Sequence, residues 1–464
     1  MKVIYQYEWK QLVRSNAFIW LTTLLIAIGI YAVFYGRNEV KQQQYKISLL
    51  QQNIGQNNNA MADSLLKHDT AASELGEFTG RLHANVPDGI SALAFGQRDI
   101  HKFAQHITNG SYFYNKYSTG YYNKTMSGEI VNPFKLLAGH LDISFVFLFL
   151  FPLYFILLSY NLFSAEEENG TIGLLGTQPV PVKKIILHKL LLRTLLVAVA
   201  GILLLLVAAV VNNSITDSRI VWFGLAFLAY VACWMGIIAL LISFKKSSWF
   251  NALALVAVWI GFTLLIPSIL NVILNTRYPV RTKTELAAAV QKANADFFAL
   301  DKKIKVDSFK HIKPYYASSF DTIGSWDDPK FYRVTHSLID QYVSPFEKER
   351  IRNVAQRNDF ANSLHFCSPT LITQHVFNDL AGSSMAQMLQ YDTSSWSYFT
   401  SISRYTDDMI FLKNNRAGKR DFERMPLYTY KPNIQIPVIA VQIATLFIAG
   451  FLLLLFSGFL INNK

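Results

Sequence analysis

The chain has 464 residues, of which 52% are hydrophobic and only 16% are charged. Soluble domains carry about 25% charged residues, so this composition argues against an ordinary soluble protein and favours a membrane protein. The net charge of +12 comes from basic loops beside apolar stretches and from polar segments whose charges fit solvated surface, so we expect no nucleic-acid partner.

Six stretches lack Asp, Glu, Lys and Arg for at least the roughly 20 residues that a helix needs to cross the hydrocarbon core. They are residues 17–36, 143–165, 194–216, 220–244, 247–276 and 432–463. The first is long, rich in bulky residues and not followed by a small-residue cleavage site, so we interpret it as a retained anchor rather than a signal peptide. The sequence therefore predicts an all-α polytopic membrane protein with six transmembrane helices.

Residues 2–15 predict a short amphipathic helix before the first span. Tyr5, Trp9 and Leu12 fall on one face at helical spacing, with basic side chains on the other. A helix of this kind lies along the headgroups of a membrane surface. We therefore expect an interfacial helix in contact with membrane lipids, with a frayed tail as the alternative.

Two long polar segments separate the spans. In 37–140, good helix formers follow the first span without a proline until Pro87, so we expect that helix to continue beyond the membrane. In 275–434, TELAAAVQKANADFFALDKKIK predicts one helix, and Ser344–Pro345 marks the start of another, SPFEKERIRNVAQRNDFANSL. A third helix, SPTLITQHVFNDLAG, is expected to stop at Gly382. We expect both segments to pack into one mainly helical domain.

Lysine and arginine gather at the short loops on one side of the predicted spans, whereas the short loop near 212–219 has one arginine opposed by Asp217. Because basic loops stay in the cytoplasm, we place both termini there and both long segments outside. The chain is then divided into an interfacial helix 1–16, spans 17–36, 141–163, 185–211, 219–244, 248–274 and 435–461, a cytoplasmic loop 164–184, and extracytoplasmic segments 37–140 and 275–434.

The sequence shows no catalytic constellation. The patterns G-x-x-x-x-G-K-[ST], H-E-x-x-H and G-x-S-x-G are absent, and the ten histidines are scattered. We therefore expect no metal site, no cofactor and no enzymatic activity in this chain. Carriers driven by proton or sodium gradients keep ionisable residues in the bilayer, but the stretches here are neutral. Energy for transport must therefore enter from elsewhere.

The loop SAEEENGTIGLLGTQPVPVKK between the second and third spans has an unusual order of residues. Three glutamates open it, a glycine permits a turn, a short apolar helical turn follows, and prolines stop it. Two interpretations stand: a rigid element that docks into a partner and moves both adjoining helices, or a solvated turn. The candidate docking residues are Glu166, Glu167, Glu168, Gly170, Thr171, Ile172, Leu174, Leu175 and Pro179.

The stretch SYNLFSAEEENGTIGLLGTQPVPVKKIILHKLL resembles the segment after the second span of type-2 ATP-binding-cassette permeases. That family has an acidic pair or triplet, Gly-Thr, two apolar residues, a proline and a basic-flanked span; Glu167 departs from it, because a basic residue often lies there. The layout is similar to a bacterial branch with large outer segments after the first span and before the last. The nitrous-oxide-reductase maturation and gliding-motility permeases resemble it. The matching positions are Glu166, Glu168, Gly170, Thr171, Leu174, Leu175 and Pro179.

The resemblance implies a permease subunit of the bacterial inner membrane, with ATP and Mg held by a separate cytoplasmic ATPase present in two copies. It also implies a second permease chain, identical or related. Small residues such as Gly201, Gly224 and Gly236 let helices approach closely, so we expect them to help that chain associate.

ATPase closure would press on residues 166–178 and tilt the spans. This movement would either export a lipid, a lipid-linked molecule or a peptide, or do mechanical work on the extracytoplasmic side. A membrane-anchored scaffold or receptor whose outer domain binds a partner without ATP is the alternative, and a membrane enzyme is a weaker third hypothesis.

Overall fold

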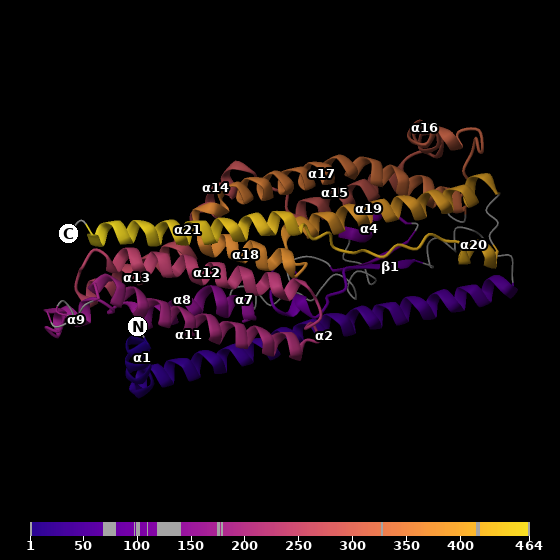
Figure 1. Cartoon of the computed structure of the whole chain (residues 1–464). Helices are drawn as coiled ribbons and strands as arrows, with labels where there is room; N and C mark the ends of the chain where they lie inside the picture. Colours follow the sequence, from indigo (N-terminus) through magenta and orange to yellow (C-terminus); the bar gives the residue numbers. More distant parts are fainter. Residues whose placement is uncertain are drawn as a thin grey trace.

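The structure is a computed structural model that describes residues 2–67, 80–96, 98, 103–108, 110–117, 141–173, 177, 180–325, 328–413 and 418–462. The molecule is elongated, and α1 (Lys2–Arg14) lies at the same end as the C-terminus of α21 (Ile436–Asn462), as Figure 1 shows. We call this the terminal end. Within the described residues, six helices are long and apolar enough to cross a membrane, so the predicted all-α polytopic fold is confirmed.

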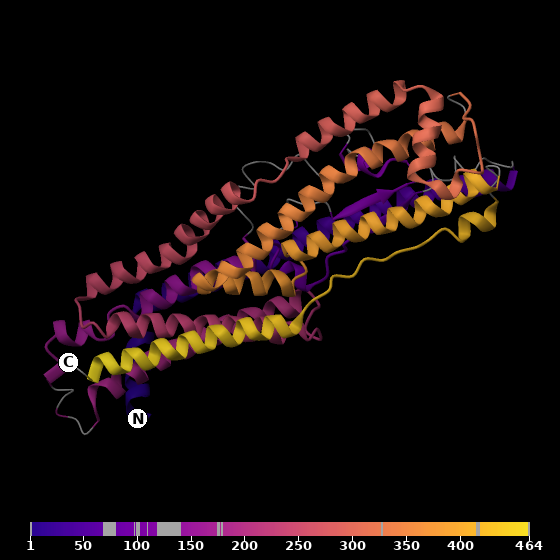
Figure 2. The same cartoon turned by 90° about the horizontal axis from the view of Figure 1, so that it is seen from above.

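The six spans lie side by side over the half of the molecule nearest the terminal end (Figures 1 and 2). Spans 2 and 5 each contain a π-helical turn, η2 and η3, a widening that is frequent at functional sites. Span 1 is the first part of α2 (Asn16–Lys67); span 2 is α7 (Ile143–Phe145), η2 (Val146–Leu150), α8 (Phe151–Ser159) and α9 (Ser164–Glu168); span 3 is α11 (Val182–Val211); span 4 is α12 (Arg219–Ile242); span 5 is α13 (Ser248–Ile260), η3 (Gly261–Leu265) and α14 (Ile266–Arg277); and span 6 is α21.

Span 4 is the central helix of the bundle, since Phe223, Tyr230 and Trp234 along it are all buried. It meets span 6 at two glycines: a Cβ atom on Gly236 would lie 2.6 Å from the carbonyl oxygen of Gly450. Only glycine permits this close contact of two backbones.

The three glycines expected to help a second chain associate pack within this chain instead. A Cβ atom on Gly201 would lie 2.1 Å from the ring of Phe227, and one on Gly224 would lie 3.5 Å from Leu205. With Gly236 against span 6, all three are used in intrachain contacts. The prediction that they mark the interface with a second chain is therefore wrong.

The helix α2 continues far beyond span 1, as predicted. Its 52 residues correspond to a length of about 78 Å, more than twice the thickness of a hydrocarbon core. Where η1 (Ile90–Ala92) crosses it, Gly36 is required, because a Cβ atom there would lie 2.2 Å from the Ala92 carbonyl oxygen. One continuous helix therefore joins the bundle to the distal end.

The two long polar segments pack together into one mainly helical body, which we call the distal domain (Figure 2). A two-stranded antiparallel sheet, with Leu82 opposite His106, is its only described sheet. Besides η1, these segments contain β1 (Arg81–Ala84), β2 (Ala104–Ile107), α4 (Tyr112–Tyr117), α15 (Lys283–Ala299), α16 (Lys302–Ile312), η4 (Pro314–Tyr316), α17 (Pro329–Leu364), η5 (His365–Cys367), α18 (Pro369–Leu380), α19 (Met385–Asp407), η6 (Asp408–Leu412) and α20 (Lys419–Glu423).

Two predicted helix boundaries in this domain are wrong. The stretch expected to form one helix breaks after Ala299, because Leu300 is extended and Asp301 caps α16 by accepting a hydrogen bond from the Lys303 amide. The other helix starts at Pro329 and contains Pro345 in its interior, since burial of the half before the proline and the ion pairs of Glu347 after it outweigh the lost hydrogen bond.

The stop of α18 at Gly382 is confirmed, with a φ of +70°. The position of α18 differs from the prediction, since this helix packs into the apolar core of the bundle instead of into the distal domain alone. Ile372, Val376 and Phe377 belong to the same buried cluster as the spans. Part of the predicted outer segment thus lies among the membrane helices.

A buried ionic cluster joins three helices of the distal domain. Asp407 of α19 pairs with Arg333 of α17 and with Lys313, which follows α16. The carboxylate of Asp407 is 1% exposed, yet the two cations outweigh its burial and lower its pKa. The distal domain therefore depends on this charge staying ionised.

We predict that Asp407→Asn destabilises the distal domain by about 3–5 kcal/mol at neutral pH, because it leaves two cations without their buried partner. A lowered carboxyl pKa stabilises the fold above the unfolded value of about 3.9, and this contribution is lost as the pH falls through the lowered value. The difference between parent and variant should therefore shrink in acid. Thermal unfolding of the detergent-solubilised chain measures it.

The control is Lys310→Gln, which breaks an ion pair with the exposed Asp321 and should change stability little. Equal melting temperatures for the Asp407→Asn chain and the parent at neutral pH would contradict the prediction.

Candidate functional site

The loop after span 2 folds into a short helix with a defined end. The helix α9 stops at Asn169, and Gly170 follows with a φ of +69°. The amide of Thr171 donates to the Glu166 carbonyl (2.9 Å) and that of Gly170 to the Glu167 carbonyl (3.0 Å), which is the Schellman arrangement. Gly170 is needed for its backbone conformation, since a Cβ atom there would meet open space.

Two of the three glutamates fix this loop to other spans. Glu166 accepts from the Thr171 hydroxyl and pairs with Lys189 of span 3, with Nζ 2.7 Å from Oε1. Glu168 accepts from both the amide and the hydroxyl of Ser248, at the start of span 5, each at 2.8 Å. The two carboxylates therefore hold the end of span 2 against spans 3 and 5.

Glu167 differs from its neighbours. Its side chain is exposed and forms no ion pair with any described residue. Ile172, after the turn, packs on the core of the bundle. The loop thus presents one free carboxylate while its two neighbours are engaged. The predicted docking residues Leu174, Leu175 and Pro179 lie outside the described residues.

A buried glutamate of α1 extends this ionic arrangement. Glu8 is 1% exposed and pairs with Lys189 (3.3 Å) and Arg193, both on span 3. Lys189 therefore lies between Glu8 and Glu166. We call Glu8, Glu166, Glu168, Lys189, Arg193 and Ser248 the loop cluster.

The predicted face of α1 is only partly the face that packs. Tyr5 has its ring 5.6 Å from that of His188, and Leu12 is buried, but Trp9 is 46% exposed. Tyr5, Glu8 and Leu12 face the bundle, which leaves Trp9 available for lipid.

Sequence reasoning missed Glu8, Lys189, Arg193 and Ser248. One signal was present: Lys189 and Arg193 are four residues apart and so share one face of a helix, and Glu8 is the only acidic residue before span 1. Their pairing across the chain depends on how α1 folds back, which no local pattern specifies.

The comparison with known families agrees with this architecture. Residues 2–406 match the family described as ABC-2 family transporter protein, so the chain belongs to that family. A comparison with curated proteins gives no match. The chain is therefore a membrane-spanning permease component of an ABC transporter.

We predict that Glu8→Ala detaches α1 from span 3. Removing one partner of a buried ion pair costs about 3–5 kcal/mol, and Glu8 makes both ion pairs that join this helix of 13 residues to span 3 among the described residues. Trypsin should then cut at Lys10 and Arg14 much faster than in the parent. Gln11→Ala, on the exposed face of the same helix, is the matched control and should leave the cleavage rate unchanged. Equal rates for the Glu8→Ala chain and the parent would refute the prediction.

Proposed function

We propose that a separate ATPase subunit drives this permease through residues 164–180, and that ATP is bound and hydrolysed only there. The observation that carries the proposal is the attachment of this loop: Glu166 holds it to span 3 and Glu168 holds it to span 5. A force on the loop therefore acts on spans 2, 3 and 5 together, whereas a solvated turn needs no such contacts.

The exposed Glu167 is the side chain we assign to the ATPase contact. The carboxylates of Glu166 and Glu168 bind Lys189 and Ser248 of the same chain, so their role is to position the loop. Leu174 and Leu175 supply the apolar part of the contact. This division refines the interpretation from sequence, in which all three glutamates faced the partner.

The active assembly contains two permease chains and two ATPase subunits in this proposal. Span 5 supports it, because only 11% of its most apolar stretch is buried within the chain, compared with 67% for spans 2 and 4. We assign this uncovered face to the second permease. The distal domain lies outside the bacterial inner membrane and both termini lie in the cytoplasm. Membership of a transporter family favours this function over a scaffold or receptor.

We predict that Glu167→Lys weakens ATPase binding about tenfold at low salt, with recovery at high salt, because it reverses one exposed charge at the contact. Replacing Leu174 and Leu175 by Asp should abolish binding, since two buried leucines contribute roughly 1.5–3 kcal/mol each. Copurification from mild detergent, with the mass of the complex, measures both the binding and the two-to-two stoichiometry.

The control for charge reversal is Asp296→Lys, which changes an exposed carboxylate on α15 of the distal domain.

Gly170→Val and Gly170→Asn form a second pair of variants. Valine is strained at this positive φ and should uncouple the loop, whereas asparagine tolerates it. If the loop variants bind and stimulate the ATPase like the parent, the loop is a solvated turn.

The proposed orientation gives a separate prediction. In a Cys367→Ser background, Lys303→Cys, at an exposed position of α16, should react with an impermeant thiol reagent in intact cells whose outer membrane, if present, is permeabilised. Lys184→Cys, at the start of span 3, should react only after lysis, because the positive-inside pattern places it in the cytoplasm. The opposite labelling pattern would overturn the orientation.

A further inference from the structure

The helix α18 lies along half of span 4. At its C-terminal end, the Leu380 carbonyl accepts a hydrogen bond from Arg219, the first residue of span 4 (3.2 Å). At its N-terminal end, the Thr370 hydroxyl is 3.0 Å from that of Tyr230, midway along the 24 residues of span 4. The ring of Phe377 stacks on that of Phe223 between these points, with centroids 4.9 Å apart. A helix from the distal segment thus reaches the middle of the bundle.

The N-terminal end of α18 is joined to the π-helical turns of spans 2 and 5. Tyr230 donates its proton to the Leu148 carbonyl in η2 (2.9 Å), so Thr370 must be the donor to Tyr230. Ser368 donates to the Phe262 carbonyl in η3 (3.1 Å). The side chains of Tyr230, Thr370 and Ser368 are nearly inaccessible to solvent, so their hydroxyl groups need partners within the protein, and these bonds provide them.

The C-terminal end of α18 is joined to span 4 and to the part of the distal domain that follows β1. Three successive carbonyls at the end of this helix accept from side chains of other segments: Leu380 from Arg219, Ala381 from Ser91 (2.9 Å) and Gly382 from Arg98 (3.4 Å). Helix ends need such donors, but here they come from span 4 and from the segment after β1. The end of α18 therefore ties those two parts together.

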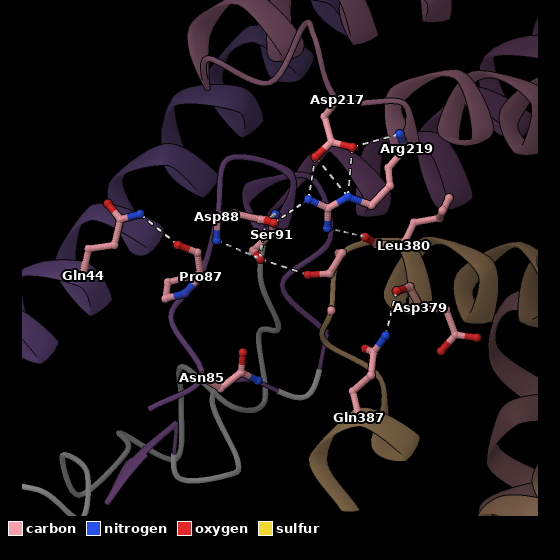
Figure 3. Close-up of polar contacts among 12 residues, drawn as sticks. Gln44, Asn85, Pro87, Asp88, Ser91, Asp217, Arg219, Asp379, Leu380 and Gln387 are labelled. Carbon is pink, nitrogen blue, oxygen red and sulfur yellow. Dashed lines mark hydrogen bonds and ion pairs between the residues drawn. The ribbon is translucent and has the colours of Figure 1, made fainter. Parts of the chain in front are cut away.

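Arg219 is the centre of this connection (Figure 3). Its guanidinium pairs with Asp217 in the loop before span 4 and with Asp88 of the distal segment. From the same segment, the Pro87 carbonyl accepts from Gln44 of the long helix α2 (2.8 Å). One arginine thus connects span 4, α18 and the part of the distal domain that packs on α2. We call Arg219, Asp217, Asp88 and the Leu380 carbonyl the Arg219 junction.

The same two spans that contact the N-terminal end of α18 meet at the loop cluster. Glu168 and Ser164 at the end of span 2 both bond to Ser248, which starts span 5. A displacement of α9 therefore moves both spans, and both carry the π-helical turns on which α18 rests.

We propose that α18 passes movement of spans 2 and 5 to the distal domain, with Tyr230 and Arg219 as the residues that position its two ends. The chain then performs mechanical work on the distal side in each ATPase cycle. This inference rests on the proposed function, because it takes the movement of α9 as its input.

Hydrogen–deuterium exchange of the full permease–ATPase complex tests the proposal, with and without ATP and vanadate. In the parent, nucleotide should change the exchange rate of amides in the loop, residues 164–173. It should also change exchange around the C-terminal end of α18, in residues 85–96 and 378–384, which we call the distal root. Arg219→Gln and Tyr230→Phe should keep the change in the loop and lose more than half of the change in the root. Tyr230→Phe keeps the ring, so it remains informative if Arg219→Gln disturbs folding.

Arg281→Gln is the matched control, because it breaks an exposed pair with Glu349 that touches neither α18 nor the Arg219 junction. It should respond as the parent does. A root response in both variants equal to that of the parent would overturn the role of α18, as would a parent that responds only in the loop. A parent without a loop response would refute the proposed function, and the inference with it.

Discussion

Polar groups inside an apolar bundle must find hydrogen-bond partners within the protein, and this constraint organises the membrane half of the molecule. In the π-helical turns of spans 2 and 5, the carbonyls of Leu148, Phe149 and Phe262 accept hydrogen bonds from side chains of other segments. Tyr230, Trp259 and Ser368 donate to them. Because Ser368 belongs to a distal segment, satisfying span 5 also determines where α18 enters the bundle. The same polar requirement thus fixes both the spans and the element between them and the distal domain.

Charge plays the corresponding role at the terminal end. Lys189 pairs with Glu8 and Glu166, while Glu168 binds the first residue of span 5. Surface ion pairs contribute little stability, but Glu8 is buried, so its pairing resists separation. The described part of the loop, residues 164–173, is bonded to spans 3 and 5 through Glu166 and Glu168, as the proposed coupling role requires.

Sequence reasoning found what local patterns encode. The spans follow from uninterrupted apolar stretches, the length of α2 from the lack of proline, and the turn at Gly170 from the need for positive φ. It was wrong where packing between residues far apart in the chain determines the local structure. Pro345 lies inside a helix because the half before it is buried and Glu347 after it is held by buried ion pairs, and Gly236 faces Gly450 of its own chain. In the site, the acidic triplet was visible, but its division into two engaged carboxylates and one free carboxylate depends on Lys189 and Ser248.

The connections of the distal domain favour movement as a unit with the bundle. It joins the spans through α2, which is continuous, and through α18, whose two ends are bonded to spans 2, 4 and 5. At the Arg219 junction, a hinge between bundle and domain would have to break the ion pairs of Arg219 with Asp88 and Asp217. A change in the tilt of the spans would therefore be enlarged at the far end of α2 rather than absorbed at its base. Such a connection supports the mechanical work that we propose at a distance from the membrane, and that work requires no conducting path through the bundle.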